Sequence, residues 1–161
     1  MNGTIDRSAT IEKVGDHAIT ITRDFDAPVD KVFRAMHDPE LIAQWVGPRR
    51  FTDQEATQVN EHGGTWTLVQ RDDEGNEFGF RGVIHGTPTP ELSIRTFEWL
   101  GMPGHVFMET MRLEDLGDGR TRVHGISVIN TKDERDGMFD SGMDVGVNEG
   151  YARLDDVLER L

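Results

Sequence analysis

The feature that most constrains the fold is a change of hydrophobic period along the chain. From Phe51 to Ile129, apolar residues recur in runs of strand length, and turn residues separate one run from the next. From Met143 onward, apolar residues recur at helical spacing instead. Antiparallel strands with one apolar face need a cover, and the last segment is the only one long enough to provide it. The sequence therefore predicts an α+β fold in which a curved antiparallel sheet wraps around a long C-terminal helix.

A single strand is expected before this meander. Between His17 and Phe25, the apolar residues Ile19, Ile21 and Phe25 alternate with polar ones. Alternation of this kind is typical of a strand with one buried face.

Two short helices are expected next. Asp26 can cap the first, Pro28 suits its first turn, and apolar residues recur at helical spacing as far as Met36. It ends near Asp38, because the residue before a proline avoids the helical region. A second helix is expected from Pro39 to Val46, ended by Gly47-Pro48.

Six strands are predicted in the meander, and the turns between them are marked by glycine and proline. The clearest turn signals are Glu61-His62-Gly63-Gly64, Asp72-Asp73-Glu74-Gly75-Asn76, Met102-Pro103-Gly104 and Gly117-Asp118-Gly119. Thr87-Pro88-Thr89-Pro90 is expected to block further pairing, because proline has no N–H for a ladder. The predicted order is one strand, two helices, six strands and one helix.

The closing helix carries one apolar stripe. Its members are Met143, Val147, Tyr151, Leu154 and Leu158, with Val157 and Leu161 beside them. Gly146 and Gly150 remove side-chain volume, which allows close packing on the sheet or the approach of a ligand. The acidic stretch from Asp133 to Asp140 is expected to favour the start of this helix through the helix dipole.

Length and charge restrict the class of protein. The 161 residues fit a single domain, 1–161, with a core of about 17–161. A formal net charge of −13 repels phosphate backbones and anionic headgroups, so nucleic acid and membranes are poor partners. The absence of cysteine excludes disulfides and thiolate metal sites. With no export signal and no apolar run near the ~20 residues of a spanning helix, a cytoplasmic location is expected.

Several motifs resemble the SRPBCC superfamily, the START-related and Bet v-like helix-grip proteins. The run from Ile19 to Phe33, with a strand, Ala27-Pro28 and then a helix, resembles the opening of these domains. The later motifs are Asp38-Pro39-Glu40-Leu41 through Gln44-Trp45, Gly63-Gly64-Thr65-Trp66, Phe80-Arg81-Gly82-Val83-Ile84, Phe97-Glu98-Trp99 and Gly119-Arg120-Thr121-Arg122-Val123. In this order they resemble the branch homologous to the activator of heat-shock protein 90 ATPase. The excess of Arg over Lys suggests a GC-rich bacterial genome.

The resemblance implies a helix-grip fold with a hydrophobic cavity between the sheet and the last helix. Across the superfamily such cavities bind lipids, polyketides, hormones or aromatic metabolites, and a minority of members are enzymes such as aromatase/cyclases. The superfamily shares no universal catalytic set, so the catalytic residues of this chain stay unknown. Fold alone does not give function.

The large apolar residues of the inner faces are the candidate cavity residues. They are Trp45, Trp66, Phe78, Phe80, Phe97, Trp99, Met108, Met143, Val147 and Tyr151. The alternative for each is ordinary core, since burying such a side chain contributes roughly 1.5–3 kcal/mol. The tryptophans could also stack on a ring-bearing ligand and offer it an indole N–H.

Ionisable residues give weaker signals. His62, His85, His105 and His124 show no metal-ligand spacing, so no metal site is expected. No cofactor is expected either, because the chain has no P-loop and no G-x-G-x-x-G in a strand-to-helix setting. His85 and His124 lie within strands and could act as acid or base, although structural roles are favoured. The strand-borne charges are Arg81, Arg95, Glu98, Glu109 and Arg112. Glu98 should face outward if Phe97 and Trp99 face inward, Glu109 and Arg112 cannot share a face, and ordinary surface charges are the favoured interpretation.

Three functions remain open. The first is binding of an apolar or aromatic small molecule, which we favour over catalysis. The second is a small enzyme of cyclase, dehydratase or hydrolase type, for which Tyr151, the only tyrosine, is the first residue to mutate. The third is a co-chaperone-like interaction module, ranked last because the separate N-terminal domain of eukaryotic co-chaperones has no counterpart here. A homodimer also stays open.

Overall fold

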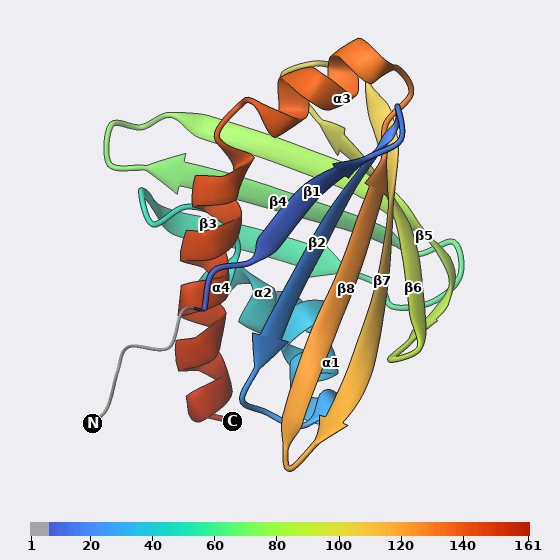
Figure 1. The fold of residues 1–161 in the computed structure, drawn as a ribbon. Helices are drawn as coiled ribbons and strands as arrows, with labels where there is room; N and C mark the ends of the chain where they lie inside the picture. The colour runs from blue at the N-terminus through green and yellow to red at the C-terminus, as the bar shows by residue number, and fades with distance from the viewer. Residues whose placement is uncertain (1–6) are drawn as a thin grey trace.

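The computed structural model describes residues 7–161 and consists of one large sheet, with the two short N-terminal helices and the long C-terminal helix on one face and a further helix near the end of the strands (Figure 1). In chain order the elements are β1 (Thr10–Val14), β2 (Ala18–Phe25), α1 (Val29–His37), α2 (Pro39–Trp45), β3 (Phe51–Gln58), β4 (Thr65–Asp72), β5 (Glu77–Thr89), β6 (Leu92–Trp99), β7 (Val106–Gly117), β8 (Arg120–Val128), α3 (Lys132–Phe139) and α4 (Met143–Glu159).

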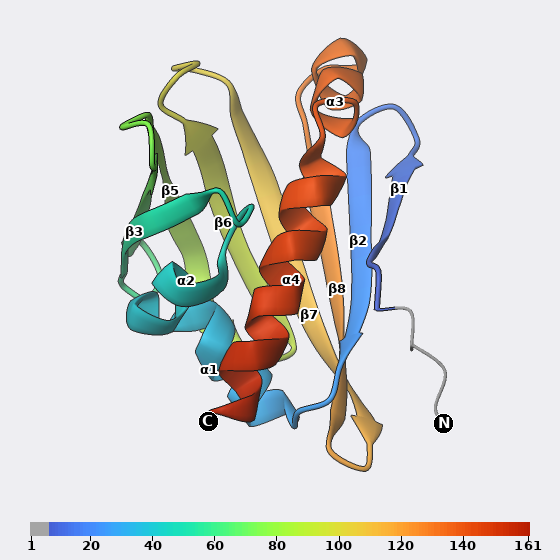
Figure 2. The ribbon, with the colours of Figure 1, turned by 90° about the vertical axis from the view of Figure 1, so that its left-hand side faces the viewer.

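The sheet is antiparallel throughout, with strand order β1-β2-β8-β7-β6-β5-β4-β3. The meander from β3 to β8 runs in sequence order, and β2 then pairs with β8 although α1, α2 and β3 to β7 lie between them in the chain. The sheet curves, and α4 stands in front of it between the β3 side and the β1–β2 side (Figure 2). The expected α+β helix-grip fold is confirmed, and so are the six strands of the meander.

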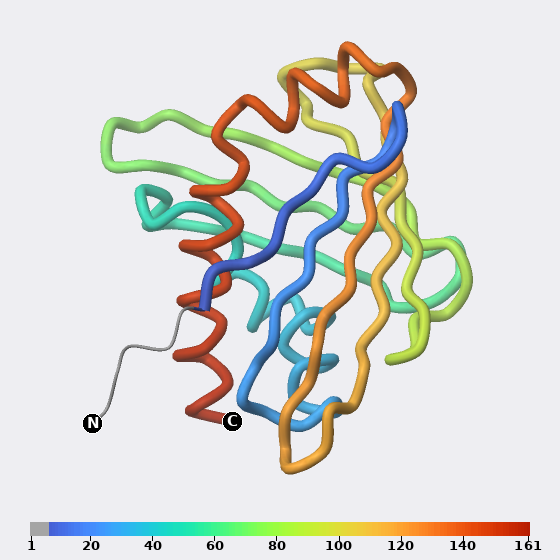
Figure 3. Tube along the Cα trace, in the orientation of Figure 1, coloured from blue at the N-terminus to red at the C-terminus, as the bar shows by residue number. Residues whose placement is uncertain are grey.

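Two elements of the described chain were not predicted. The first is β1, which pairs with β2 along its full length. Four of its five residues are exposed, so it carries almost no apolar alternation to read. The second is α3. Figure 3 shows how the chain leaves β8, passes through α3 and turns back into α4.

The acidic stretch before α4 has a different role from the one expected. Residues 133–140 do not start α4 but form most of α3, which Thr131 caps by accepting a hydrogen bond from the Glu134 N–H. Arg135 fixes this helix to the sheet by donating to the Ala18 carbonyl at 2.9 Å. The chain then turns at Gly142, whose φ of 89° few other residues adopt, and α4 begins at Met143.

The two N-terminal helices are confirmed, with one correction at their start. The N-cap of α1 is Pro28, without a side-chain hydrogen bond, so Asp26 does not cap it. The Asp26 carboxylate instead pairs with Arg7 and, at 3.3 Å, with Arg120. Asp38 caps α2 as its side chain accepts from the Glu40 N–H at 3.0 Å.

The proline-rich segment also differs from expectation. β5 continues through Pro88 to Thr89, and Thr89 pairs with Leu92 of β6. The register is irregular between His85 and Thr89, so the missing N–H of Pro88 falls where regular pairing is interrupted.

Two clusters of buried side chains hold the fold together. The larger joins Phe25, Leu113 and Val123 of the sheet to α1 and to the inner residues of α4 such as Leu154. The smaller surrounds Trp66, Leu68 and Ile84 of β4 and β5 and includes the rings of Phe80 and Phe97. The space between these clusters is the region where a cavity can form.

Candidate functional site

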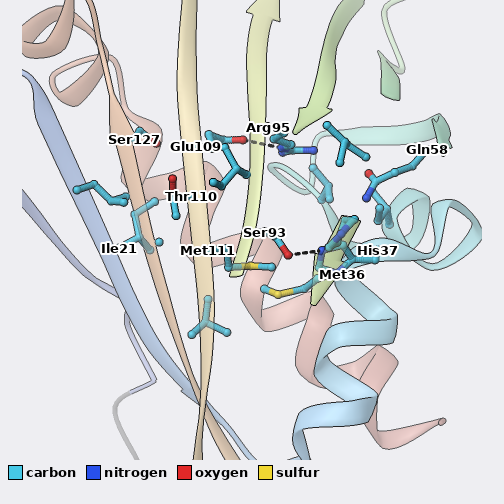
Figure 4. Close-up of a pocket in the computed structure, with 18 of the residues that line it drawn as sticks. Ile21, Met36, His37, Gln58, Ser93, Arg95, Glu109, Thr110, Met111 and Ser127 are labelled. Carbon is cyan, nitrogen blue, oxygen red and sulfur yellow. Dashed lines mark hydrogen bonds and ion pairs between the residues drawn. The ribbon is translucent and has the colours of Figure 1, made fainter. Parts of the chain in front are cut away.

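A pocket of about 180 Å³ lies between the sheet, the two short helices and α4 (Figure 4). Its wall is mainly apolar, with contributions from Ile21 of β2, Met36 of α1, Ile42 of α2, Ile84 of β5 and Met111 of β7. Met36 and Met111 project into it from opposite sides. An apolar wall with a few polar groups is the usual composition of a small-molecule site.

An ion pair faces into this pocket from the sheet. β6 and β7 are paired so that Arg95 lies directly opposite Glu109, and the Arg95 Nε donates to Glu109 Oε1 at 2.8 Å. The guanidinium also lies 4.0 Å over the Trp66 ring. Its terminal nitrogens make no hydrogen bond to any residue in the range 7–161. The interpretation of Arg95 and Glu109 as ordinary surface charges is therefore wrong, because strand register turns both toward the cavity.

Tyr151 contributes a hydroxyl from α4. Its ring meets Phe25 edge-on, with centroids 5.2 Å apart, and lies 6.0 Å from the ring of Trp45. Burial raises the pKa of Tyr151 to about 12, and the negative charge of Glu109 adds to the effect. The hydroxyl thus stays protonated at neutral pH. It makes no hydrogen bond within the described part of the chain, where every fully enclosed side-chain N or O atom has a partner. The O–H of this pocket-lining residue is therefore a donor without a partner in residues 7–161.

His37 and Ser93 form a second polar pair on the wall (Figure 4). His37, the last residue of α1, is buried, and its Nδ1 lies 2.8 Å from the carbonyl oxygen of Phe33. Its Nε2 lies 3.0 Å from Ser93 Oγ of β6. Burial lowers the pKa of His37, so the imidazole is neutral near pH 7.

Two of the ten predicted cavity residues line this pocket, namely Trp45 and Tyr151. Three others, Trp66, Phe80 and Phe97, belong to the smaller core cluster. Their strands have the expected inward phase, but at that end of the sheet the aromatic rings fill the space themselves.

The remaining predicted cavity residues lie away from the pocket. The ring of Phe78 packs near Phe51 and Trp99, and 36% of Trp99 is exposed. Met143 and Val147 lie on the first turns of α4 and do not contribute to the wall.

Met108 does not lie in the cavity where it was predicted. It alternates with Phe107 and Glu109 along β7, so it faces the opposite side of the sheet from the pocket, and 43% of it is exposed. There it borders a wide, open depression of about 560 Å³ beside α3, together with Val128 and His105.

The indole N–H groups are used inside the protein. Trp45 Nε1 donates to the Ala35 carbonyl at 2.9 Å and Trp66 Nε1 to the Thr96 carbonyl at 3.0 Å. The second bond crosses β5 at Gly82, where an added Cβ would lie 2.4 Å from the indole nitrogen. Neither tryptophan therefore offers its N–H to a ligand.

The four histidines weighed from the sequence do not reach the pocket wall. His62 accepts from the Gly86 N–H, His105 pairs with Glu134, and His124 pairs with Glu114; His85 lies against the ring of His62. In residues 7–161 no group of acidic, histidine or cysteine side chains is arranged to hold a metal ion. In the same range, no helix has the length and apolarity to span a membrane.

The expected orientation of Glu98 is correct, but it is not an ordinary surface charge. It lies on the face opposite Phe97, paired in register with Arg81, and only 9% of it is exposed. The Glu98 carboxylate accepts from Arg81 Nε at 2.9 Å and from the Gly104 N–H at 2.7 Å. These bonds lower its pKa, with the Gly104 N–H as the largest cause.

The sequence gives little sign of the residues that do line the site. His37 precedes Asp38-Pro39, so its position in the sequence indicates only the end of a helix. Ser93 is one small residue in a strand and gives no signal of a site. Arg95 and Glu109 become partners only through the pairing of β6 with β7. The alternation of Ser93, Arg95 and Phe97 along β6 was the one available signal that these side chains share the inner face.

Comparisons with known proteins give one matching family model and several solved structures of the same fold. The family model "Activator of Hsp90 ATPase homolog 1-like protein" matches residues 26–159. A crystal structure of a Rhodobacter sphaeroides protein is 23% identical, with a TM-score of 0.86, over 94% of this chain and 99% of that one. A crystal structure of a Nitrosomonas europaea protein is 22% identical, with a TM-score of 0.78, over 92% of this chain and 97% of that one.

A further similar structure is DynU16, a protein in the dynemicin biosynthetic locus. It is 21% identical with a TM-score of 0.67, and the match covers 90% of this chain and 48% of that one. At such identities the likeness shows a shared fold. The search of curated proteins gave no significant match.

Proposed function

The chain belongs to the family of activator of Hsp90 ATPase homolog 1-like proteins, and from the pocket it encloses we propose that it binds a compact ring compound carrying one oxygen acceptor. The observation that carries this proposal is a largely apolar pocket lined by Tyr151, whose hydroxyl has no hydrogen-bond partner among residues 7–161.

The size of the pocket favours a small ligand. An engineered protein cavity of about 150 Å³ holds benzene, and the present pocket of about 180 Å³ is of similar size. Sites for larger, drug-sized ligands usually enclose about 300–1,000 Å³. A single ring with a short substituent therefore fits better than a lipid chain or a polyketide.

The polar groups favour an acceptor on that ligand. The Tyr151 O–H and the terminal N–H groups of Arg95 are donors without partners in the described chain. Glu109 already neutralises the Arg95 charge at 2.8 Å. A neutral carbonyl oxygen can accept from these donors without bringing an unpaired charge into an apolar site.

The occurrence of the similar DynU16 in the dynemicin biosynthetic locus is consistent with a role for this chain in small-molecule metabolism. Binding by a pocket of this kind also agrees with the hydrophobic ligands that the superfamily resemblance implies.

The test is a thermal-shift and calorimetric comparison of three probes. Acetophenone presents a ring and a carbonyl, isopropylbenzene has nearly the same shape without the oxygen, and dodecanoate is a lipid chain. Acetophenone should raise the melting temperature most, because a ligand that binds only the folded state stabilises it. Tyr151→Phe should weaken acetophenone binding about five- to tenfold, the value of one hydrogen bond, and leave isopropylbenzene binding unchanged.

Met108→Ala serves as the matched control, because it removes a large side chain from the opposite face. It should leave both affinities unchanged. If no ring compound shifts the melting temperature, or if Met108→Ala weakens acetophenone as much as Tyr151→Phe does, the proposal is wrong.

A further inference from the structure

The His37–Ser93 pair has the geometry of a nucleophile beside its base. We propose that Ser93 is a nucleophile activated by His37 and that the protein transfers the acyl group of small esters to water. This inference rests on the proposed binding function, because the ester must enter the pocket whose wall holds both residues.

The hydrogen bonds around His37 determine which ring nitrogen is the base. The Phe33 carbonyl oxygen can only accept, so Nδ1, at 2.8 Å, carries the proton and donates it. In the neutral ring Nε2 then has a free lone pair, and Ser93 Oγ lies 3.0 Å from it. A nucleophile, a base and a third group that orients the base are the recurring parts of nucleophilic catalysis.

A second acceptor competes for the serine proton. The Thr89 carbonyl oxygen lies 3.3 Å from Ser93 Oγ, against 3.0 Å for His37 Nε2. The shorter contact favours the bond to His37. Ser93 is partly exposed and lines the pocket, so its Oγ can meet a bound molecule.

Arg95 lies where it can stabilise the negative charge that develops during the reaction. It follows Ser93 by two residues in β6 and so lies on the same face, roughly 7 Å further along the strand. Its terminal N–H groups have no partner in residues 7–161. Glu109 pairs with Arg95 through Nε, and the terminal N–H groups can still donate to the ester carbonyl oxygen as negative charge develops on it during attack.

The reaction balances without a cofactor. Ser93 Oγ forms a bond to the ester carbonyl carbon while its proton moves to His37 Nε2. The bond to the leaving alkoxide breaks, and the alkoxide takes the proton from Nε2. Water then attacks the acyl-serine, transfers a proton to Nε2, and releases the carboxylic acid as the Ser93 oxygen is protonated again.

The group that orients His37 is the Phe33 carbonyl and not a carboxylate, which limits the rate of the reaction. The imidazolium formed during the reaction has no ionic partner at Nδ1 and lies near the positive charge of Arg95. Turnover should be slow, and with an ester whose leaving group departs easily, acylation should be faster than hydrolysis of the acyl-serine, which should then accumulate and be detectable.

The experiment uses p-nitrophenyl acetate as the ester and intact-protein and peptide mass spectrometry as the readout. A single acetyl group should appear on the peptide containing Ser93. Ser93→Ala should lose this adduct and lower p-nitrophenol release at least roughly 100-fold. Ser141→Ala is the control, because Ser141 is exposed in the turn before α4 and is not one of the residues that line the pocket; it should retain the adduct.

The pH dependence of Ser93 acetylation distinguishes a catalytic role of His37 from a purely structural one. Protonation of His37 removes the base, so acetylation should fall at low pH in the wild type, and His37→Gln should acetylate at least roughly 100-fold more slowly. Melting of each variant, and acetophenone binding by Ser93→Ala, show whether the pocket is intact. Acetophenone binding without acetylation of Ser93, or acetylation of lysines alone, overturns this inference and leaves the binding function standing. If the protein neither binds acetophenone nor is acetylated at Ser93, both the binding function and the acyl transfer are wrong.

Discussion

At the scale of single residues, Arg23 is a buried charge whose ionic partner is Asp155. Its side chain is 3% exposed, and Nη1 and Nη2 each donate at 2.7 Å to one oxygen of Asp155 on α4. Nε donates to the Arg7 carbonyl, and the guanidinium lies 4.5 Å over the ring of Phe25. A bidentate pair of this kind fixes both the position and the rotation of α4 against β2.

Removing Asp155 should therefore destabilise the fold strongly. Asp155→Ala leaves the Arg23 charge buried without its carboxylate, and we expect the free energy of unfolding in urea to fall by about 3 kcal/mol, at the low end for such pairs. The low end applies because 25% of the Asp155 side chain is exposed.

Asp156→Ala is the control, since the neighbouring carboxylate is exposed. Its free energy of unfolding should change by no more than about 0.5 kcal/mol. Equal effects of the two variants would contradict the role given to the Arg23–Asp155 pair.

At the scale of elements, α4 is held by the loop that follows α2 as well as by the sheet. A Cβ at Gly150 would lie 3.1 Å from the Gly47 nitrogen and 3.2 Å from the Trp45 carbonyl oxygen. Gly146 is less restricted, with Pro48 Cδ at 3.4 Å. The close packing expected of these glycines thus occurs against the α2–β3 loop, and it holds Trp45 and Tyr151 together at the pocket.

A branched side chain at Gly150 should separate α4 from that loop. We expect Gly150→Val to lower the free energy of unfolding by about 1–3 kcal/mol, the usual effect of overpacking, and to weaken acetophenone binding because Tyr151 moves with the helix. Urea unfolding and calorimetry measure the two effects.

Gly137→Ala in α3 is the matched change without a clash, since no atom lies within 4 Å of its added Cβ. It should stabilise the protein by about 0.5–1 kcal/mol through helix propensity. A Gly150→Val variant as stable as the wild type would disprove the close approach.

At the scale of the whole molecule, stability depends on pH through a buried group as well as through the surface. The chain carries 30 acidic and 17 basic side chains. Burial lowers the pKa of His37 below its ordinary value of 6.5. The unfolded chain therefore binds a proton at this residue before the folded protein does, and stability falls as the pH drops from 6.5 toward the folded-state pKa.

His37→Gln should remove this part of the pH dependence. Between pH 7 and pH 5 the variant should lose less stability than the wild type, measured by urea unfolding at each pH. Between pH 8 and pH 9, above the titration of both states, the two slopes should coincide. Parallel curves from pH 7 to pH 5 would show that His37 is not buried in its neutral form.

Local patterns accounted for most of the secondary structure. The Ile19–Phe25 alternation, the Asp38-Pro39 break and the glycine turns of the meander each placed an element with only its neighbours in sequence. β1 was missed because its exposed residues carry no such pattern, and α3 because a polar helix resembles an acidic linker.

The sequence by itself determined the elements, their order and the inward phase of residues such as Phe97, because periodicity and turn chemistry act over a few residues. Only the tertiary structure decided which inward residues fill the core and which border an opening. Strand register brought Arg95 opposite Glu109, the packing of α1 carried His37 to Ser93, and the α2–β3 loop fixed Tyr151. Such contacts join distant segments, so they depend on sheet curvature and helix position, which no local pattern encodes.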